Sequence, residues 1–231
     1  MKNKIFIFGN GEFAELAKYY FENDDKYSGI KIEGFCVSDD QYKDKTFLNL
    51  PVVPMNEVER VYPKDQFNGF IAISYRKLNE NRKNIFINFK DKGYKLESFI
   101  SSESHNANFA HGENCFILEN QSIQKNVSIG NNVFIWSSNH IGHSSSIQDN
   151  VYISSKVCLG GRVTVGQNSF LGMNSTISDG VTIGKKVFVS MGSVITKSIK
   201  DECIVIEDQS KIINQEDKIY EKLKKNILKK Y

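Results

Sequence analysis

An aliphatic residue recurs at every sixth position through most of the second half of the chain. Fourteen successive hexads carry isoleucine, leucine or valine at their first position. These residues are Ile117, Ile123, Ile129, Ile135, Ile141, Ile147, Ile153, Leu159, Val165, Leu171, Ile177, Ile183, Val189 and Ile195. An α-helix has about 3.6 residues per turn and a strand repeats every second residue, so neither explains a strict period of six.

A parallel β-helix explains this period. Each hexad forms one flat side, the aliphatic residue fills the interior, and small residues and glycines allow the corners. Three hexads make one coil of 18 residues, and successive coils stack about 4.8 Å apart. The repeat therefore predicts a β-helix domain over residues 101–205, although the period alone is also compatible with a purely structural repeat.

The first hundred residues alternate short apolar strands with amphipathic helices. Strands are expected at 5–8, 30–37 and 70–74, and helices at 12–22 and 78–92. This alternation is typical of a small parallel sheet in an α/β domain.

The sequence thus divides into an α/β domain (1–100), a β-helix (101–205) and a C-terminal amphipathic helix (206–231). In the last segment, apolar residues at intervals of four follow Gln215, with lysines on the opposite face. We expect this helix to pack on the end or side of the β-helix and cover its open edge. A basic helix on a membrane surface is the alternative.

Composition excludes several classes of function. The net charge of +3 does not point to nucleic-acid binding. The four cysteines are scattered and form no C-x-x-C pair, so neither a zinc site nor a disulfide framework is expected. No apolar stretch approaches the ~20 residues of a membrane span or forms a signal peptide, and we expect a cytoplasmic protein.

The histidines of the β-helix are the first candidates for chemistry. His140 and His143 flank Ile141, which holds the inward position of its hexad, so His143 faces outward. An imidazole accepts a proton near neutral pH, as an attacking amine or hydroxyl requires. An ordinary surface histidine is the alternative at position 143. His140 stacks beneath Cys158 and either orients an acceptor or serves the fold.

The 18-residue period places Gly161 one coil above His143 and Lys125 one coil below. A free backbone N–H at Gly161 would hold a thioester carbonyl and stabilise the developing oxyanion. Glycine also lets a pantetheine arm approach the backbone closely. A tight structural corner at Gly160 and Gly161 is the alternative.

A glycine-rich turn joins the first strand to the first helix. The segment from Gly9 to Ala14 reads G-x-G-x-x-A, a pattern that holds phosphate on backbone N–H groups. Polar residues at the end of the next strand would contact the base or ribose. The candidates are Gly9, Asn10, Gly11, Ser38, Asp39 and Asp40. The domain lacks a second βαβαβ half, which argues against a dinucleotide; a plain turn and a solvated loop are the alternative.

A Rossmann-like half domain followed by hexapeptide repeats resembles the nucleotide-sugar acetyltransferases of the hexapeptide-repeat family. The similarity is to the sialic-acid O-acetyltransferases and the bacillosamine-pathway N-acetyltransferases, and it covers nearly all of residues 1–200. The run from Asn139 to His143 also resembles the catalytic stretch of lipid A UDP-N-acetylglucosamine acyltransferases.

The resemblance implies a left-handed β-helix and a homotrimer with active sites between subunits. It implies acetyl-CoA as co-substrate, no metal, and a UDP-, dTDP- or GDP-linked sugar as the acceptor. The product would enter a surface glycan such as lipopolysaccharide or capsule.

The resemblance also assigns residues. His143 matches the general base and Gly161 the glycine whose amide binds the acetyl carbonyl. Gly9, Gly11, Asp39 and Asp40 match the nucleotide-sugar site of the N-terminal domain. The substrate site is also expected to include Asn10, Ser38, Asn139 and His140. The coenzyme A site is expected to include Tyr152, Gly160, Gly161, Lys185 and Lys186. Tyr152 stands where relatives carry a histidine near the acetyl group, and Gly142 and Ser144 stand where several carry an acidic neighbour of the base.

We therefore expect direct acetyl transfer from acetyl-CoA to the amine of a nucleotide-linked sugar, with His143 as base. Transfer to a sugar hydroxyl is the alternative within the same chemistry. A zinc β-helix enzyme of the γ-carbonic anhydrase kind and a trimeric binding or scaffold protein are the rival classes.

Overall fold

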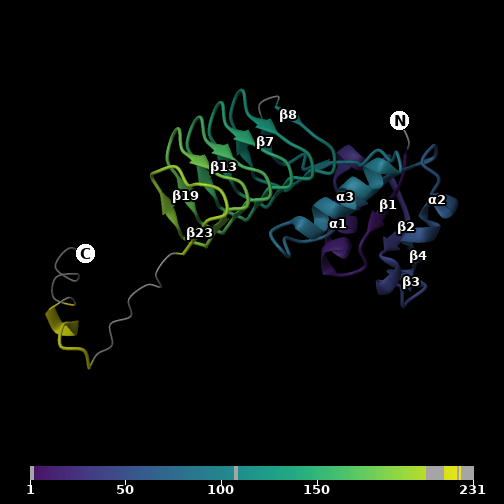
Figure 1. Ribbon diagram of the computed structural model, residues 1–231, viewed down its shortest axis with the longest axis horizontal. Helices are drawn as coiled ribbons and strands as arrows, with labels where there is room; N and C mark the ends of the chain where they lie inside the picture. Colours follow the sequence, from purple (N-terminus) through teal and green to yellow (C-terminus); the bar gives the residue numbers. More distant parts are fainter. Residues whose placement is uncertain (1–2, 107–108, 207–215, 223, 225–231) are drawn as a thin grey trace.

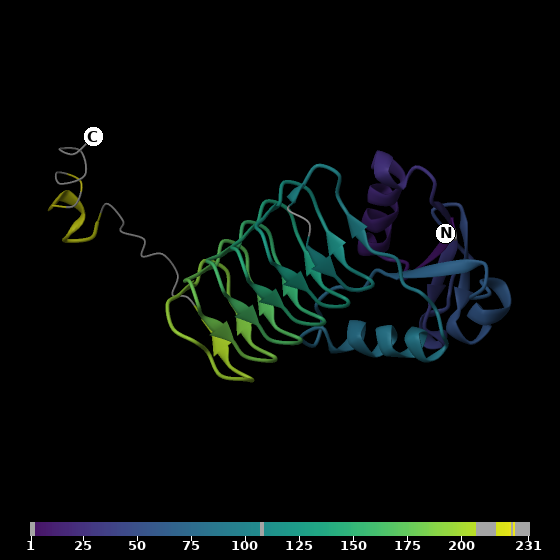
Figure 2. The same ribbon diagram turned by 90° about the horizontal axis from the view of Figure 1, so that it is seen from above.

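The computed structural model describes residues 3–106, 109–206, 216–222 and 224. It confirms the predicted fold class, a Rossmann-like α/β domain followed by a left-handed parallel β-helix. The α/β domain lies at the N-terminal end of the β-helix, and the coils extend away from it (Figure 1, Figure 2). Most of the predicted helix over 215–230 lies outside the described residues and stays a prediction.

The α/β domain is built on a five-stranded sheet in the order β3-β4-β2-β1-β5. Its strands are β1 (Lys4–Phe8), β2 (Lys31–Val37), β3 (Thr46–Phe47), β4 (Leu50–Pro54) and β5 (Phe67–Ile71). Its helices are α1 (Glu12–Asn23), α2 (Val58–Val61) and α3 (Glu80–Asp91), with short 3-10 turns η1 (Asp25–Tyr27), η2 (Asp39–Gln41) and η3 (Met55–Glu57). All strand pairs are parallel except β3 with β4.

Two predicted elements of this domain are shifted in the structure. The strand expected at 70–74 is β5, which begins earlier because buried Asn68 and Gly69 are part of it. A side chain at Gly69 would collide with Leu96 and Phe6, so glycine is needed there for packing. The helix expected from 78 begins at Glu80, because Leu78 and Asn79 have the positive φ values of a left-handed turn.

The β-helix has three parallel sheets. The aromatic sheet holds β6 (Phe99–Ile100), β9 (Phe116–Ile117), β12 (Phe134–Ile135), β15 (Tyr152–Ile153), β18 (Phe170–Leu171), β21 (Phe188–Val189) and β23 (Ile204–Val205). The histidine sheet holds β7 (His105–Asn106), β10 (Ser122–Ile123), β13 (His140–Ile141), β16 (Cys158–Leu159), β19 (Thr176–Ile177) and β22 (Val194–Ile195). The serine–threonine sheet holds β8 (Ala110–His111), β11 (Ser128–Ile129), β14 (Ser146–Ile147), β17 (Thr164–Val165) and β20 (Thr182–Ile183).

The aliphatic position of the repeat forms the interior of these coils. All fourteen predicted residues are at most 5% exposed. The strands also pair with the predicted offset, as β13 does with β16, where His140 lies beside Cys158 and Ile141 beside Leu159. Burial of each branched side chain contributes roughly 1.5–3 kcal/mol, so the repeat is itself the core of the domain.

A second apolar layer joins the two domains. The outward residues of the aromatic sheet include Phe116, Phe134 and Tyr152, which are buried rather than solvent-exposed. Phe13 of α1 packs against Phe116 and Phe134 at ring-centroid distances of 5.5 and 5.3 Å. This contact places the N-terminal domain against the aromatic sheet.

A ladder of asparagines marks the corner beside this layer. Asn114, Asn132, Asn150 and Asn168 have φ values of 54°, 58°, 61° and 63°, in the left-handed region that asparagine tolerates. Each of the first three donates its side-chain N–H to the next along the ladder, at 2.8, 2.8 and 3.5 Å. At its first rung, Asn114 accepts the backbone N–H of Ile71 at the end of β5 at 2.7 Å, so the ladder also binds the N-terminal sheet.

Arg82 of α3 completes the junction between the domains. Its side chain is fully buried, and its guanidinium donates to the side chain of Asn79 at 3.0 Å and to the carbonyls of Asn150 and Asn132 at 3.1 and 3.3 Å. The guanidinium also lies 4.1 Å from the ring centroid of Phe134. Burial lowers the pKa of Arg82 to about 9, so the group keeps its charge at neutral pH. These contacts fix the N-terminal domain relative to the coils.

Candidate functional site

His143 lies at the corner between the histidine sheet and the serine–threonine sheet, directly after β13. Its side chain is exposed. Its backbone is held on both sides, since the N–H donates to Gln124 Oε1 at 2.8 Å and the carbonyl accepts the N–H of Arg162 at 2.8 Å. The corner thus presents an imidazole to solvent from a rigid backbone.

The imidazole of His143 lies against the backbone of Gly161, in the stacked order that the 18-residue period predicts. A Cβ atom added at Gly161 would lie 2.6 Å from Nε2 and 2.9 Å from Cε1 of His143. Non-bonded carbon and nitrogen atoms do not approach so closely, so the ring occupies the space that any other side chain at 161 would need. The absence of a side chain therefore sets the position of the imidazole.

Gly161→Ala is expected to lower kcat about tenfold or more in an acyl-transfer assay, because the added methyl displaces the His143 ring. A misplacement of about 1 Å costs roughly a hundredfold in rate when a catalytic group must be aligned. The matched control is Gly29→Ala, since a Cβ atom there meets nothing within 4 Å. An unchanged kcat in Gly161→Ala would show that the ring position does not matter.

The backbone N–H of Gly161 is not free, which corrects the expectation from the sequence. It donates to Asp179 Oδ1 at 2.9 Å, one coil further along the same corner. The physical reason is the repeat itself, because an aspartate at this position of a hexad reaches the amide one coil below. The same contact joins Asn131 to Asp149 at 2.7 Å.

Asn139 and His140 differ in how accessible they are to an acceptor substrate. His140 is half-buried and faces outward on β13. Asn139 was expected in the substrate site, but it is 2% exposed and its side chain forms hydrogen bonds within the protein. Its Oδ1 accepts the N–H of Val157 at 2.7 Å, and its Nδ2 donates to the carbonyl of Trp136. Asn139 therefore stabilises the corner before β13 and offers no free polar group to a substrate.

Three of the residues expected at the coenzyme A site lie away from His143 within one chain. Tyr152 is 4% exposed and packs between the two domains, with Phe170 stacked at 5.4 Å and Tyr75 at 5.0 Å. Lys185 and Lys186 follow β20, at the corner between the serine–threonine and aromatic sheets. Lys186 there lies 3.4 Å from Glu80 of α3. A single chain brings only Gly160 and Gly161 of the predicted set to His143.

The N-terminal candidates do gather at one edge of the sheet. β1 and β2 are adjacent and parallel, so the turn after β1 and the loop after β2 leave from the same carboxyl edge. The chain passes to β2 on one side of β1 and to β5 on the other, which makes this edge a topological switch point, where α/β sheets bind ligands.

Gly9 and Gly11 have distinct roles in the turn at this edge. Gly9 has φ +125°, and a Cβ atom there would lie 2.8 Å from the carbonyl oxygen of Ala72. Gly11 is the N-cap of α1, and the space beside it is open. The first turn of α1 carries Glu12 and Glu15, whose carboxylates oppose a bound phosphate unless they turn away.

The loop after β2 is partly committed to the fold. Asp39 Oδ1 accepts the backbone N–H of Asn56 at 3.0 Å, and Asp40 accepts the side-chain N–H of Gln41 at 3.1 Å. Both aspartates and Ser38 lie at or near the surface. The loop can therefore present polar groups beside the glycine turn, although Asp39 has one oxygen already engaged.

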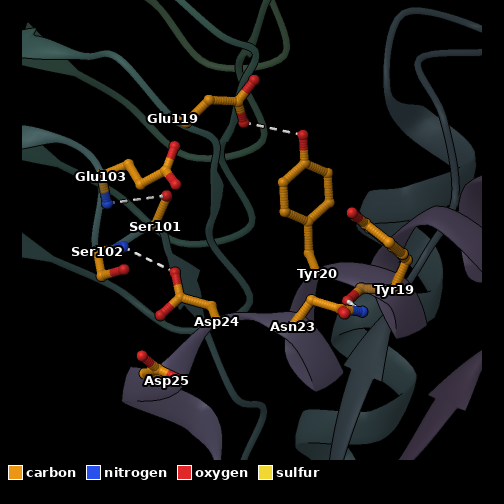
Figure 3. Close-up of a pocket in the computed structure, with 9 residues that line it drawn as sticks. All are labelled: Tyr19, Tyr20, Asn23, Asp24, Asp25, Ser101, Ser102, Glu103 and Glu119. Carbon is orange, nitrogen blue, oxygen red and sulfur yellow. Dashed lines mark hydrogen bonds between the residues drawn. The ribbon is translucent and has the colours of Figure 1, made fainter.

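An acidic hollow of about 410 Å³ lies between α1 and the first coils. Figure 3 shows the residues that line it, which are Tyr19, Tyr20, Asn23, Asp24, Asp25, Ser101, Ser102, Glu103 and Glu119. Its carboxylates would repel a diphosphate, so it does not fit a nucleotide site. No sequence pattern pointed to it, because its residues come from three separate segments.

Glu119 lines this hollow and also connects the N-terminal domain to the β-helix through hydrogen bonds. It accepts the hydroxyls of Tyr20 at 2.8 Å and Ser137 at 2.6 Å. Burial alone would raise the pKa of the Glu119 carboxyl, but the hydrogen bonds from Ser137, its own backbone and Tyr20 lower it overall. The carboxylate is thus ionised at neutral pH and links α1 to two coils.

Among the described residues, no group of three or more His, Cys, Asp or Glu side chains is arranged to hold a metal ion. The described helices include none that is long and apolar enough to cross a membrane.

The repeat region matches known protein-family models, and the whole fold is similar to solved structures. Residues 126–161 match the family model "Bacterial transferase hexapeptide (six repeats)", and residues 162–197 match "Hexapeptide repeat of succinyl-transferase". No curated protein matches the chain significantly.

Solved structures extend this similarity to both domains. The acetyltransferase domain of PglB from Neisseria gonorrhoeae has a TM-score of 0.74 at 20% identity, covering 87% of this chain and 95% of that one. PerB from Caulobacter crescentus, solved with CoA and GDP-perosamine, has a TM-score of 0.75 at 20% identity, covering 87% and 92%. WeeI from Acinetobacter baumannii has a TM-score of 0.63 at 18% identity, covering 90% and 99%. The resemblance drawn from the sequence is confirmed at the level of the fold.

Proposed function

We propose that the protein is an acetyl-CoA-dependent N-acetyltransferase that acts on a nucleotide-linked amino sugar. The observation that carries the proposal is the exposed imidazole of His143 packed against Gly161 on a hexapeptide β-helix. The same two-domain fold is found in PerB, solved with CoA and GDP-perosamine, and in the acetyltransferase domain of PglB. Structures were also solved for variants of the Caulobacter perosamine N-acetyltransferase in which a histidine is replaced by asparagine or alanine. They support the proposal that a histidine takes part in the reaction.

The proposed mechanism is direct transfer in a ternary complex. The neutral amine of the sugar attacks the thioester carbon, and its N–H proton passes to the imidazole of His143. The carbonyl oxygen becomes an oxyanion held by the backbone N–H of Gly161. When the tetrahedral intermediate collapses, the C–S bond breaks, and the thiolate of coenzyme A takes a proton from the imidazolium of His143. No acyl-enzyme forms.

The N-terminal turn is the proposed nucleotide-sugar site. Gly9, Asn10 and Gly11 would hold the diphosphate at the start of α1, and the loop from Ser38 to Asp40 would contact the nucleoside. The switch-point position of this edge supports the assignment. Because Arg82 and the asparagine ladder fix the two domains, the acceptor site stands at a constant distance from the coils.

We further propose a homotrimer with active sites between subunits. His143 lies on an exposed corner, where a second subunit could enclose a bound thioester. Lys185 and Lys186 belong to the coenzyme A site only if a second subunit brings them to His143.

The proposed location is the cytoplasm. The four cysteines are unpaired, which fits the reducing conditions of that compartment. The acetylated sugar would then serve the synthesis of a surface glycan.

The proposal predicts that the protein binds acetyl-CoA before any acceptor is added. Isothermal titration calorimetry should give one site per chain with a Kd in the micromolar range typical of KM values. Sedimentation in the same buffer reports the trimer. Absence of acetyl-CoA binding by a folded trimer would favour a binding or scaffold protein.

A further inference from the structure

Asp179 follows Gly161 by one coil in the column that also contains His143, and Lys197 follows it one coil further. Its Oδ1 accepts the backbone N–H of Gly161 at 2.9 Å, and its Oδ2 lies 3.6 Å from a guanidinium nitrogen of Arg162. The carboxylate is 64% exposed, so it can move without opening the core. Its two oxygens thus contact two partners at once, one neutral and one cationic.

The contact with Gly161 conflicts with the proposed role of that amide. A backbone N–H makes one strong hydrogen bond, so the Asp179 carboxylate and a thioester carbonyl compete for it. A carboxylate beside the carbonyl would also oppose the negative charge that develops on the oxygen in the transition state. The acyl donor can use the Gly161 amide only after Asp179 has left it.

The same contact elsewhere in the β-helix separates this site from an ordinary corner. Asp149 accepts the N–H of Asn131 at 2.7 Å in the serine–threonine column, in the same manner as Asp179. The side chain of Asn131 also contacts Asp149, with Nδ2 donating to Oδ1 at 3.4 Å. Gly161 has no side chain that could make such a contact, and the ring of His143 is its neighbour.

We propose that Asp179 is a displaceable acceptor that occupies the Gly161 amide until the thioester binds. On binding, the acyl carbonyl takes the amide, and the carboxylate leaves the amide while it keeps its contact with Arg162. Asp179 is thus a positioning residue that lowers the affinity for the acyl group while the amide stays ordered. This inference rests on the proposed function and concerns the selectivity of the same site for acetylated over free coenzyme A.

The test compares acetyl-CoA with free coenzyme A, which lacks the carbonyl. In Asp179→Ala, the ratio of the Kd of coenzyme A to the Kd of acetyl-CoA should rise about three- to thirtyfold over wild type. That range follows from the loss of one competing hydrogen bond to a charged, exposed group. The long-range loss of negative charge affects both ligands and cancels in the ratio.

Two further variants make the result specific. Asp179→Asn keeps a side-chain acceptor without the charge, so the ratio should rise less than in Asp179→Ala. Asp149→Ala removes the matched contact at a corner outside the proposed site, and its ratio should stay within about twofold of wild type. Circular dichroism melting of each variant shows whether the coils remain folded.

The outcomes separate this inference from the proposed function. A ratio unchanged in Asp179→Ala, with acetyl-CoA binding intact, overturns the displacement and leaves the acetyltransferase standing. Equal weakening of both ligands also overturns it, because Asp179 would then hold the coenzyme rather than yield to the acyl group. If wild-type protein fails to bind acetyl-CoA at all, the proposed function falls, and this inference falls with it.

Discussion

His143→Asn is expected to lower kcat for acetyl transfer by about a hundredfold to ten-thousandfold. Removal of a general base in the transition state has an effect of this size. Asparagine fits the exposed corner, and the backbone contacts of residue 143 with Gln124 and Arg162 do not involve the imidazole. The Kd of acetyl-CoA should therefore stay within about threefold of wild type, so the loss falls on the chemical step.

The matched control for this variant is His111→Asn. His111 is an exposed histidine on the serine–threonine sheet, and its ring contacts the carbonyl of Gly112 and the ring of Phe109. Its replacement should leave kcat within about twofold of wild type. Activity of His143→Asn within about tenfold of wild type would remove His143 from the role of base.

Arg82→Met is expected to destabilise the protein by about 3 kcal/mol or more. The change removes donors from buried carbonyls of Asn132 and Asn150, and a buried acceptor left without a partner costs about 1–3 kcal/mol. Methionine fills much of the same volume, so the loss reports mainly the hydrogen bonds and the contact with Phe134. Urea unfolding monitored by circular dichroism measures the effect.

Two comparisons give the Arg82 result its meaning. Arg82→Lys keeps a charge with fewer donors and should fall between Arg82→Met and wild type. Arg76→Met replaces an exposed arginine of the loop that precedes α3 and should change the free energy of unfolding by less than about 0.5 kcal/mol. A loss below about 1 kcal/mol in Arg82→Met would mean that the domain junction depends on the apolar layer alone.

The β-helix was predictable because every hexad repeats one physical requirement. An inward aliphatic residue at a fixed spacing is needed at each side of each coil, and all fourteen are buried as the repeat predicts. The α/β domain has no such repetition. β4 was missed because Pro51 and Pro54 interrupt its apolar pattern, although proline is tolerated at the ends of a strand.

The junction of the domains could have been found from the same repeat. The outward position just before each inward residue is aromatic on every third hexad, as at Phe116, Phe134, Tyr152, Phe170 and Phe188. An aromatic series on one outer face indicates a covered sheet. The contacts of Arg82 with the carbonyls of Asn132 and Asn150 could not be predicted from the sequence. Every residue has a backbone carbonyl, so these contacts require no particular residue type at either position.

The candidate site was predictable only where stacking decided it. His143 beside Gly161 follows from the 18-residue coil, whereas Asp179 lies two coils from His143 and entered no sequence motif. Asn139 was misplaced because its neighbour in sequence, His140, faces outward, whereas Asn139 occupies the corner and turns its amide inward. Tyr152 was assigned by resemblance, and its burial follows from the N-terminal domain that covers its sheet.

Thiol release from acetyl-CoA in the presence of UDP-, dTDP- and GDP-linked amino sugars measures the proposed reaction itself. We expect release of one thiol per acetylated amine with one of these acceptors, little release without acceptor, and loss of the reaction in His143→Asn. Each amino sugar is paired with its hydroxyl analogue. Release with the hydroxyl analogues alone would contradict N-acetylation, and no release with any acceptor would contradict the proposed activity.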